Sequence, residues 1–224
     1  MQRSGRRIGT LAALAGASLS AVALEAIRVH LTGTLEHGWL VWNLGLAWIP
    51  FVLALVLYDG HRRGVTGLVL APIGALWLLF FPNAPYILTD FIHLAPAVGV
   101  PLWLDAGLIS MFAFTGLLLG YASLYLVQAV VREVAGAAAA WTAAFGALAL
   151  ASVGIYLGRF VRLNSWDVLT DPGFVLGLAR VRLAEPLGNP ELIAVTGFFT
   201  VFLALMYLVI YGLAGLGPET ERRG

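Results

Sequence analysis

Six apolar runs divide the sequence, and each is long enough to cross a lipid bilayer. A membrane-spanning helix needs about 20 consecutive, mostly apolar residues. The runs that meet this requirement are residues 8–27, 39–57, 65–81, 103–131, 137–157 and 192–213. Polar and apolar residues do not alternate over stretches of about ten positions, as the strands of a membrane barrel would. We therefore predict an all-α, polytopic transmembrane bundle of about six spanning helices, with short interfacial or re-entrant helices on its outer face.

The composition agrees with one membrane domain. Of the 224 residues, 60% are hydrophobic and 11% are charged, and the mean hydropathy is +0.90. Soluble domains carry about a quarter charged residues. Nearly every residue belongs to an apolar run or to a short connection, so we predict a single integral membrane domain over residues 1–224, with the lipid bilayer as its main partner.

The arginines predict the orientation, because cytoplasmic loops collect Lys and Arg. Placing both termini in the cytoplasm puts eight arginines on that side: Arg3, Arg6, Arg7, Arg62, Arg63, Arg132, Arg222 and Arg223. The Lys-free, Ala-rich and Leu-rich usage is typical of a GC-rich bacterium, so we expect the bacterial inner (plasma) membrane. An alternative is that the first run is a cleaved signal peptide, which would leave five helices in the same orientation.

Polar side chains mark the outer end of the third run, in LFFPNAPYILTDFIHL at 79–94. Prolines 82 and 85 disfavour helix in the residues before them, so the third helix should end near Phe81 and a short helix should begin near Pro85. On such a helix Tyr86 and Asp90 lie four residues apart and Asp90 and His93 three, which predicts one polar face. Asn83, just before it, could bind substrate or simply cap this helix.

A second polar stretch, IYLGRFVRLNSWD at 155–167, carries arginines on the side where the positive-inside tendency does not expect them. Arg159 and Arg162 form an i, i+3 pair, and Trp166 follows Arg162 at i+4. Asn164, Ser165 and Asp167 indicate a helix end and a new start, and residues 168–184 favour an amphipathic helix on the outer surface. Arg28, Arg180 and Arg182 would also face outward.

Topology brings these stretches to one face, where we predict a polar vestibule. Asp90 and His93 are its candidate catalytic acid–base groups, and Glu25 and Arg28 are candidate ion-pair partners within it. The candidate substrate-binding residues are Asn83, Tyr86, Arg159, Arg162, Asn164, Trp166 and Asp167. Purely structural roles stay open. Asp90 could simply form a neutralising ion pair with Arg159 or Arg162, and Glu25 could do the same with Arg28. Tyr86 and Trp166 could be ordinary aromatic residues of the membrane interface.

Several kinds of chemistry are not expected. The chain has no Cys and a net charge of +1, so there is no thiolate chemistry and nothing that favours nucleic acid. We expect no metal, because His93 has one carboxylate close by in sequence, and no cofactor, because no phosphate-binding loop occurs. The segments GLLLG at 116–120 and GIYLG at 154–158 predict close packing between the fourth and fifth helices, or alternatively a homodimer face.

FPNAPYILTDFIHL and GRFVRLNSWD resemble the signature segments of the bacterial membrane-protein family known as domain of unknown function 1361. The resemblance extends from the second to the sixth run. It implies a small polytopic bacterial inner-membrane protein and implies no reaction.

Three function classes therefore remain open. In the first, the outer pocket binds an anionic group, such as a lipid or lipid-linked phosphate, and the protein is a membrane enzyme using Asp90 or His93. In the second, the same residues serve a small transporter. In the third, the protein is a non-catalytic subunit of a membrane assembly. The substrate and the oligomeric state are not determined by these patterns.

Overall fold

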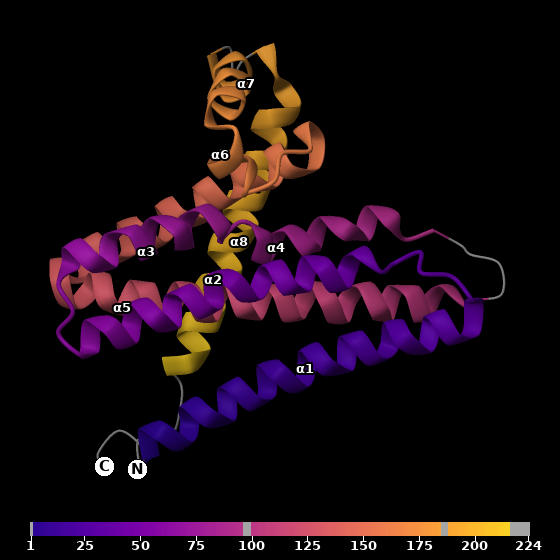
Figure 1. The fold of residues 1–224 in the computed structure, drawn as a ribbon, viewed down its shortest axis with the longest axis horizontal. Helices are drawn as coiled ribbons and strands as arrows, with labels where there is room; N and C mark the ends of the chain where they lie inside the picture. The colour runs from indigo at the N-terminus through magenta and orange to yellow at the C-terminus, as the bar shows by residue number, and fades with distance from the viewer. Residues whose placement is uncertain (1, 96–99, 185–187, 216–224) are drawn as a thin grey trace. The chain divides into compact units, whose positions relative to one another are not determined.

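The computed structural model describes residues 2–95, 100–184 and 188–215, and they are helical almost throughout (Figure 1). No β-strand lies in these ranges, which confirms the all-α prediction. The elements are α1 (Gln2–Thr32), α2 (Trp39–Arg62), α3 (Gly67–Phe80), α4 (Asn83–Tyr86), η1 (Ile87–His93), α5 (Leu102–Tyr156), η2 (Leu157–Val161), α6 (Asp167–Thr170), α7 (Pro172–Ala184) and α8 (Pro190–Gly215).

Five helical segments within the described ranges are long and apolar enough to cross a membrane, as a membrane bundle requires. The longest, Leu102–Val161, has 60 residues, whereas one span needs about 20. Inside it, Gly136 has φ 86° and ψ 173°, a conformation outside the helical region that glycine adopts readily. The segment therefore consists of two helical stretches, divided where the sequence predicts the boundary between its fourth and fifth spans.

The chain divides into two compact units, Met1–Ala140 and Trp141–Gly224. We call them unit 1 and unit 2. Each has its own packing, described in turn below. The prediction of a single membrane domain over the whole chain stays a prediction.

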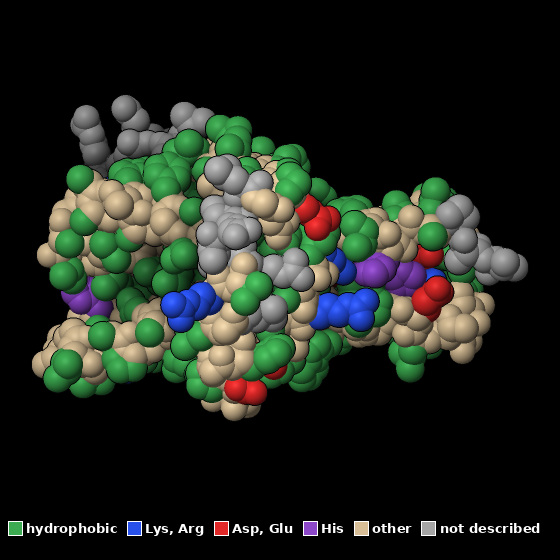
Figure 2. All heavy atoms as spheres, turned by 90° about the horizontal axis from the view of Figure 1, so that it is seen from above, with side chains coloured by type: hydrophobic (Ala, Val, Ile, Leu, Met, Phe, Trp, Pro, Cys, Tyr) green, Lys and Arg blue, Asp and Glu red, His purple; other side chains and the backbone are tan. Residues whose placement is uncertain are grey.

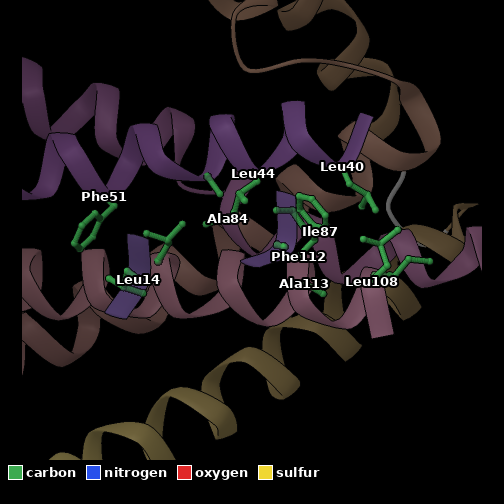
Figure 3. Close-up of a cluster of buried hydrophobic side chains, with 13 residues drawn as sticks. Leu14, Leu40, Leu44, Phe51, Ala84, Ile87, Leu108, Phe112 and Ala113 are labelled. Atoms are coloured by element: carbon green, nitrogen blue, oxygen red, sulfur yellow. The ribbon is translucent and has the colours of Figure 1, made fainter. Parts of the chain in front are cut away.

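Unit 1 has a continuous apolar core, to which α1, α2, α4, η1 and α5 contribute (Figure 3). α2 packs against both α3 and α4. Leu44 of α2, Ala84 of α4 and Phe112 of α5 are almost completely buried in this cluster. Burying apolar surface is the main force that holds such elements together in water, but in a bilayer close packing and hydrogen bonds between helices take over this role. The core therefore fixes α4 and η1, which carry the first polar stretch, against α2 and α5.

Polar contacts join the helices of unit 1 at both ends. Arg7 makes a two-pronged contact with Asp59, at 2.8 Å and 2.6 Å, and so ties the start of α1 to the end of α2. Arg28, near the other end of α1, contacts Asp105 at the start of α5. At about 1.5 Å of rise per residue, the helix between Arg7 and Arg28 spans about 31 Å, close to the thickness of the hydrocarbon core, about 30 Å. The two arginines are therefore spaced like groups at opposite membrane surfaces.

The glycines of GLLLG lie against α4 and η1 within unit 1. A Cβ atom added to Gly116 would come within 2.8 Å of the carbonyl oxygen of Ala84, and one added to Gly120 would come within 3.0 Å of the Ala84 side chain. These small residues admit the proline-containing segment, because α4 and η1 need the room that missing side chains leave. The predicted packing of the fourth helix on the fifth stays a prediction.

Unit 2 contains the rest of α5, then η2, α6, α7 and α8. Trp141 of α5 packs on Tyr211 of α8 with ring centroids 4.9 Å apart. Asn189 begins α8, where its Oδ1 accepts a hydrogen bond from the N–H of Leu192 at 3.2 Å. Many large apolar side chains are exposed, and on the face drawn in Figure 2 the charged side chains lie in small groups among apolar ones. Such a surface suits contact with lipid.

Candidate functional site

The polar stretch of unit 1 is wound more tightly than an α-helix. α3 ends at Phe80, one residue before the predicted end, and the chain continues through the single turn of α4 into η1, a 3₁₀-helix over Ile87–His93. Nδ2 of Asn83 donates a hydrogen bond to the carbonyl oxygen of Phe80 at 2.9 Å. This contact satisfies a carbonyl at the end of α3, where no further turn of helix supplies a donor. The side chain of Asn83 thus stabilises the end of α3, in addition to its place in the polar stretch.

The 3₁₀ winding decides which side chains of this stretch share a row. Residues three apart lie above one another in a 3₁₀-helix, so Asp90 aligns with His93. Tyr86, four residues before Asp90, falls on a different row. Its carbonyl oxygen accepts a hydrogen bond from Oγ1 of Thr89 at 2.7 Å. The predicted polar face therefore contains Asp90 and His93, while the α-helical spacing assumed for Tyr86 does not occur.

Asp90 and His93 differ strongly in their exposure to solvent. The Asp90 residue is 1% exposed, and its Oδ2 accepts a hydrogen bond from Nδ2 of Asn43 at 3.1 Å. His93 is exposed, and its ring meets that of Trp39 edge-on at a centroid distance of 4.9 Å. The N-terminal turns of α2 thus hold both side chains. A buried carboxyl therefore lies in the same row as an exposed imidazole.

Replacing Asn43 with alanine is expected to lower the free energy of unfolding by about 1.5–3 kcal/mol, because a hydrogen bond to a buried carboxyl is lost. Chemical denaturation in detergent measures this loss. A double-mutant cycle with Asp90→Ala, which removes the acceptor, isolates the pair. The assignment would be contradicted if Asn43→Ala cost the same in the wild-type and Asp90→Ala backgrounds.

A cluster of charged residues lies where α1 ends and α5 begins. Arg28 is completely buried, and its Nε contacts Oδ1 of Asp105, itself 2% exposed, at 2.6 Å. Nη2 of Arg28 reaches Oε2 of Glu36 at 3.0 Å. The sequence suggested Glu25 as the partner of Arg28, one turn away on the same helix. In the structure Arg28 of α1 instead forms its ion pair with another helix, because Asp105 lies beside it in the first turn of α5.

Glu25 and His37 complete this cluster. Glu25 is 3% exposed, and neither of its carboxylate oxygens has a hydrogen-bond partner among the described residues. His37, in the connection between α1 and α2, is 5% exposed. Burial, followed by the charge of Arg28, lowers the pKa of the His37 imidazole below its usual value. His37 is therefore neutral near pH 7, and Arg28 supplies the positive charge of the cluster.

Topology predicts that Glu36, His37 and Asn43 lie on the same outer face, but sequence reasoning did not include them among the site residues, and it left Asp105 out as well. Asp105 carried a usable signal, since it is an acidic residue at the start of an apolar run, and such a residue needs a partner at membrane depth. Asn43 carried the same signal in a weaker form. Neither signal identifies the partner, because Asp105 lies 77 residues from Arg28 and Asp90 lies 47 residues from Asn43.

The arginine stretch lies in unit 2, where the helix is irregular. η2 (Leu157–Val161) is a π-helix and contains Arg159. Arg162 follows with φ 61° and ψ 35°, in the left-handed region. The N–H of Leu163 then bonds the carbonyl oxygen of Leu157 at 3.1 Å, which closes the turn. Arg162 is exposed and Arg159 is partly exposed.

The remaining site residues of unit 2 form the turn after Arg162. Oδ2 of Asp167 accepts hydrogen bonds from the backbone N–H of Asn164 at 2.7 Å and from its Nδ2 at 3.3 Å. Trp166 is partly exposed just before α6. The carboxylate of Asp167 thus orders the backbone that follows the arginines. Next in the chain, Oδ1 of Asp171 accepts a hydrogen bond from the N–H of Phe174 at 3.0 Å and so caps α7. α7 lies within residues 168–184, where the sequence predicts a helix.

Asp90 and His93 belong to unit 1, and Arg159 and Arg162 belong to unit 2. The vestibule that would join them stays a prediction. Within the part of the chain that the structure describes, no three His, Asp or Glu residues are grouped so that they could hold a metal ion.

Comparison with known proteins identifies the family. No curated protein and no solved structure matches the chain. Residues 42–206, well over half of the chain, match the family described as Protein of unknown function (DUF1361). This range includes both polar stretches that resemble the family, and the resemblance is confirmed. The chain therefore belongs to the DUF1361 family of proteins of unknown function.

Proposed function

We propose that this protein is a multi-pass protein of the bacterial inner membrane that binds an anionic group, such as the phosphate of a lipid or lipid-linked molecule, through Arg159 and Arg162. The guanidinium group presents planar, paired donors that match phosphate oxygens. Asn164, Trp166 and Asp167 would border the bound group in unit 2.

The observation that carries this proposal is the distorted backbone of the arginine stretch. A single π-helical turn inside an α-helix often marks a functional site. A non-glycine residue in the left-handed region costs about 1–3 kcal/mol and persists only where the surrounding structure imposes it. Both irregularities fall on GRFVR. A segment that only connected two helices would not need to depart from regular helical geometry at its two arginines.

The contacts of unit 1 support a cytoplasmic N-terminus. Arg7 and Asp59 join the start of α1 to the end of α2, where Arg62 and Arg63 follow. His61 contacts Glu133 at 3.0 Å, so the neighbour of Arg132 reaches the same end. Arginines therefore gather at one end of unit 1, as expected for its cytoplasmic end. Arg222 and Arg223 lie outside the described residues.

Asp90 and His93 favour the enzyme version of this proposal. A buried carboxyl and an exposed imidazole in one row of η1 suit general acid–base chemistry, in which one group takes a proton and the other exchanges it with water. Asn43 and Trp39 would orient them. A small transporter is the second candidate, favoured by the buried ionisable residues Glu25, Arg28 and Asp105 of unit 1.

Native mass spectrometry of the gently extracted protein tests the anion site. We expect wild type to retain an anionic lipid or lipid-linked molecule, and Arg159→Ala with Arg162→Ala to lose most of it. The matched control is Arg62→Ala with Arg63→Ala, which removes the same charge at the other arginine pair and should leave binding unchanged.

Three outcomes are informative. Loss in the first double variant alone would support the site. Equal loss in both double variants would show that net charge, not these arginines, retains the lipid. If wild type retains nothing while the first double variant only unfolds more easily, the arginines stabilise the fold and the proposal is wrong.

A further inference from the structure

Glu25 is a buried carboxyl that no contact with the described residues of unit 1 explains. It lies on α1, one turn before Arg28, and both its oxygens lack a hydrogen-bond partner among the described residues. Removing an ionised carboxylate from water costs several kcal/mol unless a partner compensates it. Arg28 is the nearby cation, but within the described residues its hydrogen bonds go to Asp105 and Glu36.

The buried charged groups around Glu25 carry a net negative charge, which one more positive charge would balance. Arg28 attracts the Glu25 carboxylate and Asp105 repels it. Glu36 and the neutral His37 lie around Arg28 and Asp105. His93, on η1, interacts electrostatically with His37. The Glu36 side chain is 64% exposed, so water screens its charge. The buried part then contains one guanidinium and two carboxylates, which is one negative charge in excess.

We infer that Glu25 is a proton-binding group inside unit 1, one that takes up and releases a proton separately from the anion site of unit 2. In the uptake step a hydronium ion transfers its proton to a carboxylate oxygen of Glu25, forming an O–H bond and leaving water. A proton needs only one oxygen, whereas hard metal ions need about six oxygen ligands. Nη1 of Arg28 and Nδ1 of His37, also buried without partners, can bind the water that such a transfer requires. Glu36, exposed and bonded to Arg28, provides the contact with solvent.

Infrared difference spectroscopy of the full-length protein in lipid nanodiscs tests this inference. Between alkaline and acidic buffer, wild type should gain the carbonyl band of a protonated carboxylic acid, and Glu25→Gln should lose that band. Glu25→Asp should retain a carboxyl band at a shifted frequency. The matched control is Glu191→Gln, which changes an exposed acid at the start of α8.

The results separate the possibilities. Titration spectra of wild type and Glu25→Gln that are identical, with Glu25→Gln folded by circular dichroism, would overturn the inference. So would a Glu25 band that is present at every pH, since it would show a permanently neutral acid. A titration that moves when sodium replaces choline would overturn the assignment to a proton alone. Lipid retention is measured separately on Arg159 and Arg162, so either proposal can fail without the other.

Discussion

Replacing Arg28 with alanine is expected to lower the free energy of unfolding by about 3–5 kcal/mol, because the change leaves the buried Asp105 without its partner. Asp105 is 2% exposed and accepts from Nε of Arg28 at 2.6 Å. Losses of this size come from an uncompensated buried charge, not from the intrinsic strength of the pair. Equilibrium unfolding of the full-length protein in mixed detergent micelles measures the difference from wild type.

Arg7→Ala is the matched control. Arg7 and Asp59 form an ion pair of similar length, but their side chains are 45% and 30% exposed. Such exposed pairs contribute about 0.2–1 kcal/mol. A double variant, Arg28→Met with Asp105→Leu, should recover most of the stability that Arg28→Ala loses, since apolar groups of similar volume can replace a buried pair. Equal small losses for Arg7→Ala and Arg28→Ala would contradict the buried cluster.

Gly116→Ala is expected to destabilise the protein by about 1–3 kcal/mol, the usual cost of forcing an extra methyl group into a packed core. The new Cβ would lie 2.8 Å from the carbonyl oxygen of Ala84 and 2.7 Å from Cδ1 of Ile87. The Ile87 side chain can rotate, but the backbone of α4 must move as a whole. Because α4 continues into η1, the shift should also weaken the contact between Asn43 and Asp90.

Gly107→Ala supplies the comparison within the same helix. No atom lies within 4 Å of a Cβ added there, and alanine favours helix over glycine by up to about 1 kcal/mol. We expect this variant to be as stable as wild type or slightly more stable. The two substitutions are chemically identical, so thermal unfolding of both separates packing against α4 from helix propensity. Equal effects would mean that GLLLG does not contact α4 and η1.

The sequence predicted the regular parts of the fold because they depend on local properties. Apolar length alone identifies a spanning helix, since the bilayer requires about 20 residues whatever the neighbouring helices are. Proline similarly predicted the end of α3 near Phe81, because it acts on the residue before it. The break at Gly136 falls between two predicted spans for a similarly local reason: glycine, which has no Cβ, readily adopts the non-helical conformation found there.

The candidate site was predicted in part. Asp90 and His93 were named from their spacing, yet the relation of Tyr86 to Asp90 depends on whether the turn is α-helical or 3₁₀. That choice is made by packing, because α4 and η1 must fit against the glycines of α5. The partners of Arg28 and Asp90 could not be predicted from the sequence for a different reason. In both pairs the two residues lie far apart along the chain.

The sequence by itself determined that this is a helical membrane protein of the DUF1361 family, where its long apolar runs lie, and which two stretches carry polar side chains. Hydrophobic length and proline chemistry act within a few residues, so no tertiary information is needed for these conclusions. Only the tertiary structure decided that Arg28 pairs with Asp105 and not with Glu25, and that GLLLG receives α4. These outcomes depend on which helices approach one another, and that is settled by packing over the whole of unit 1.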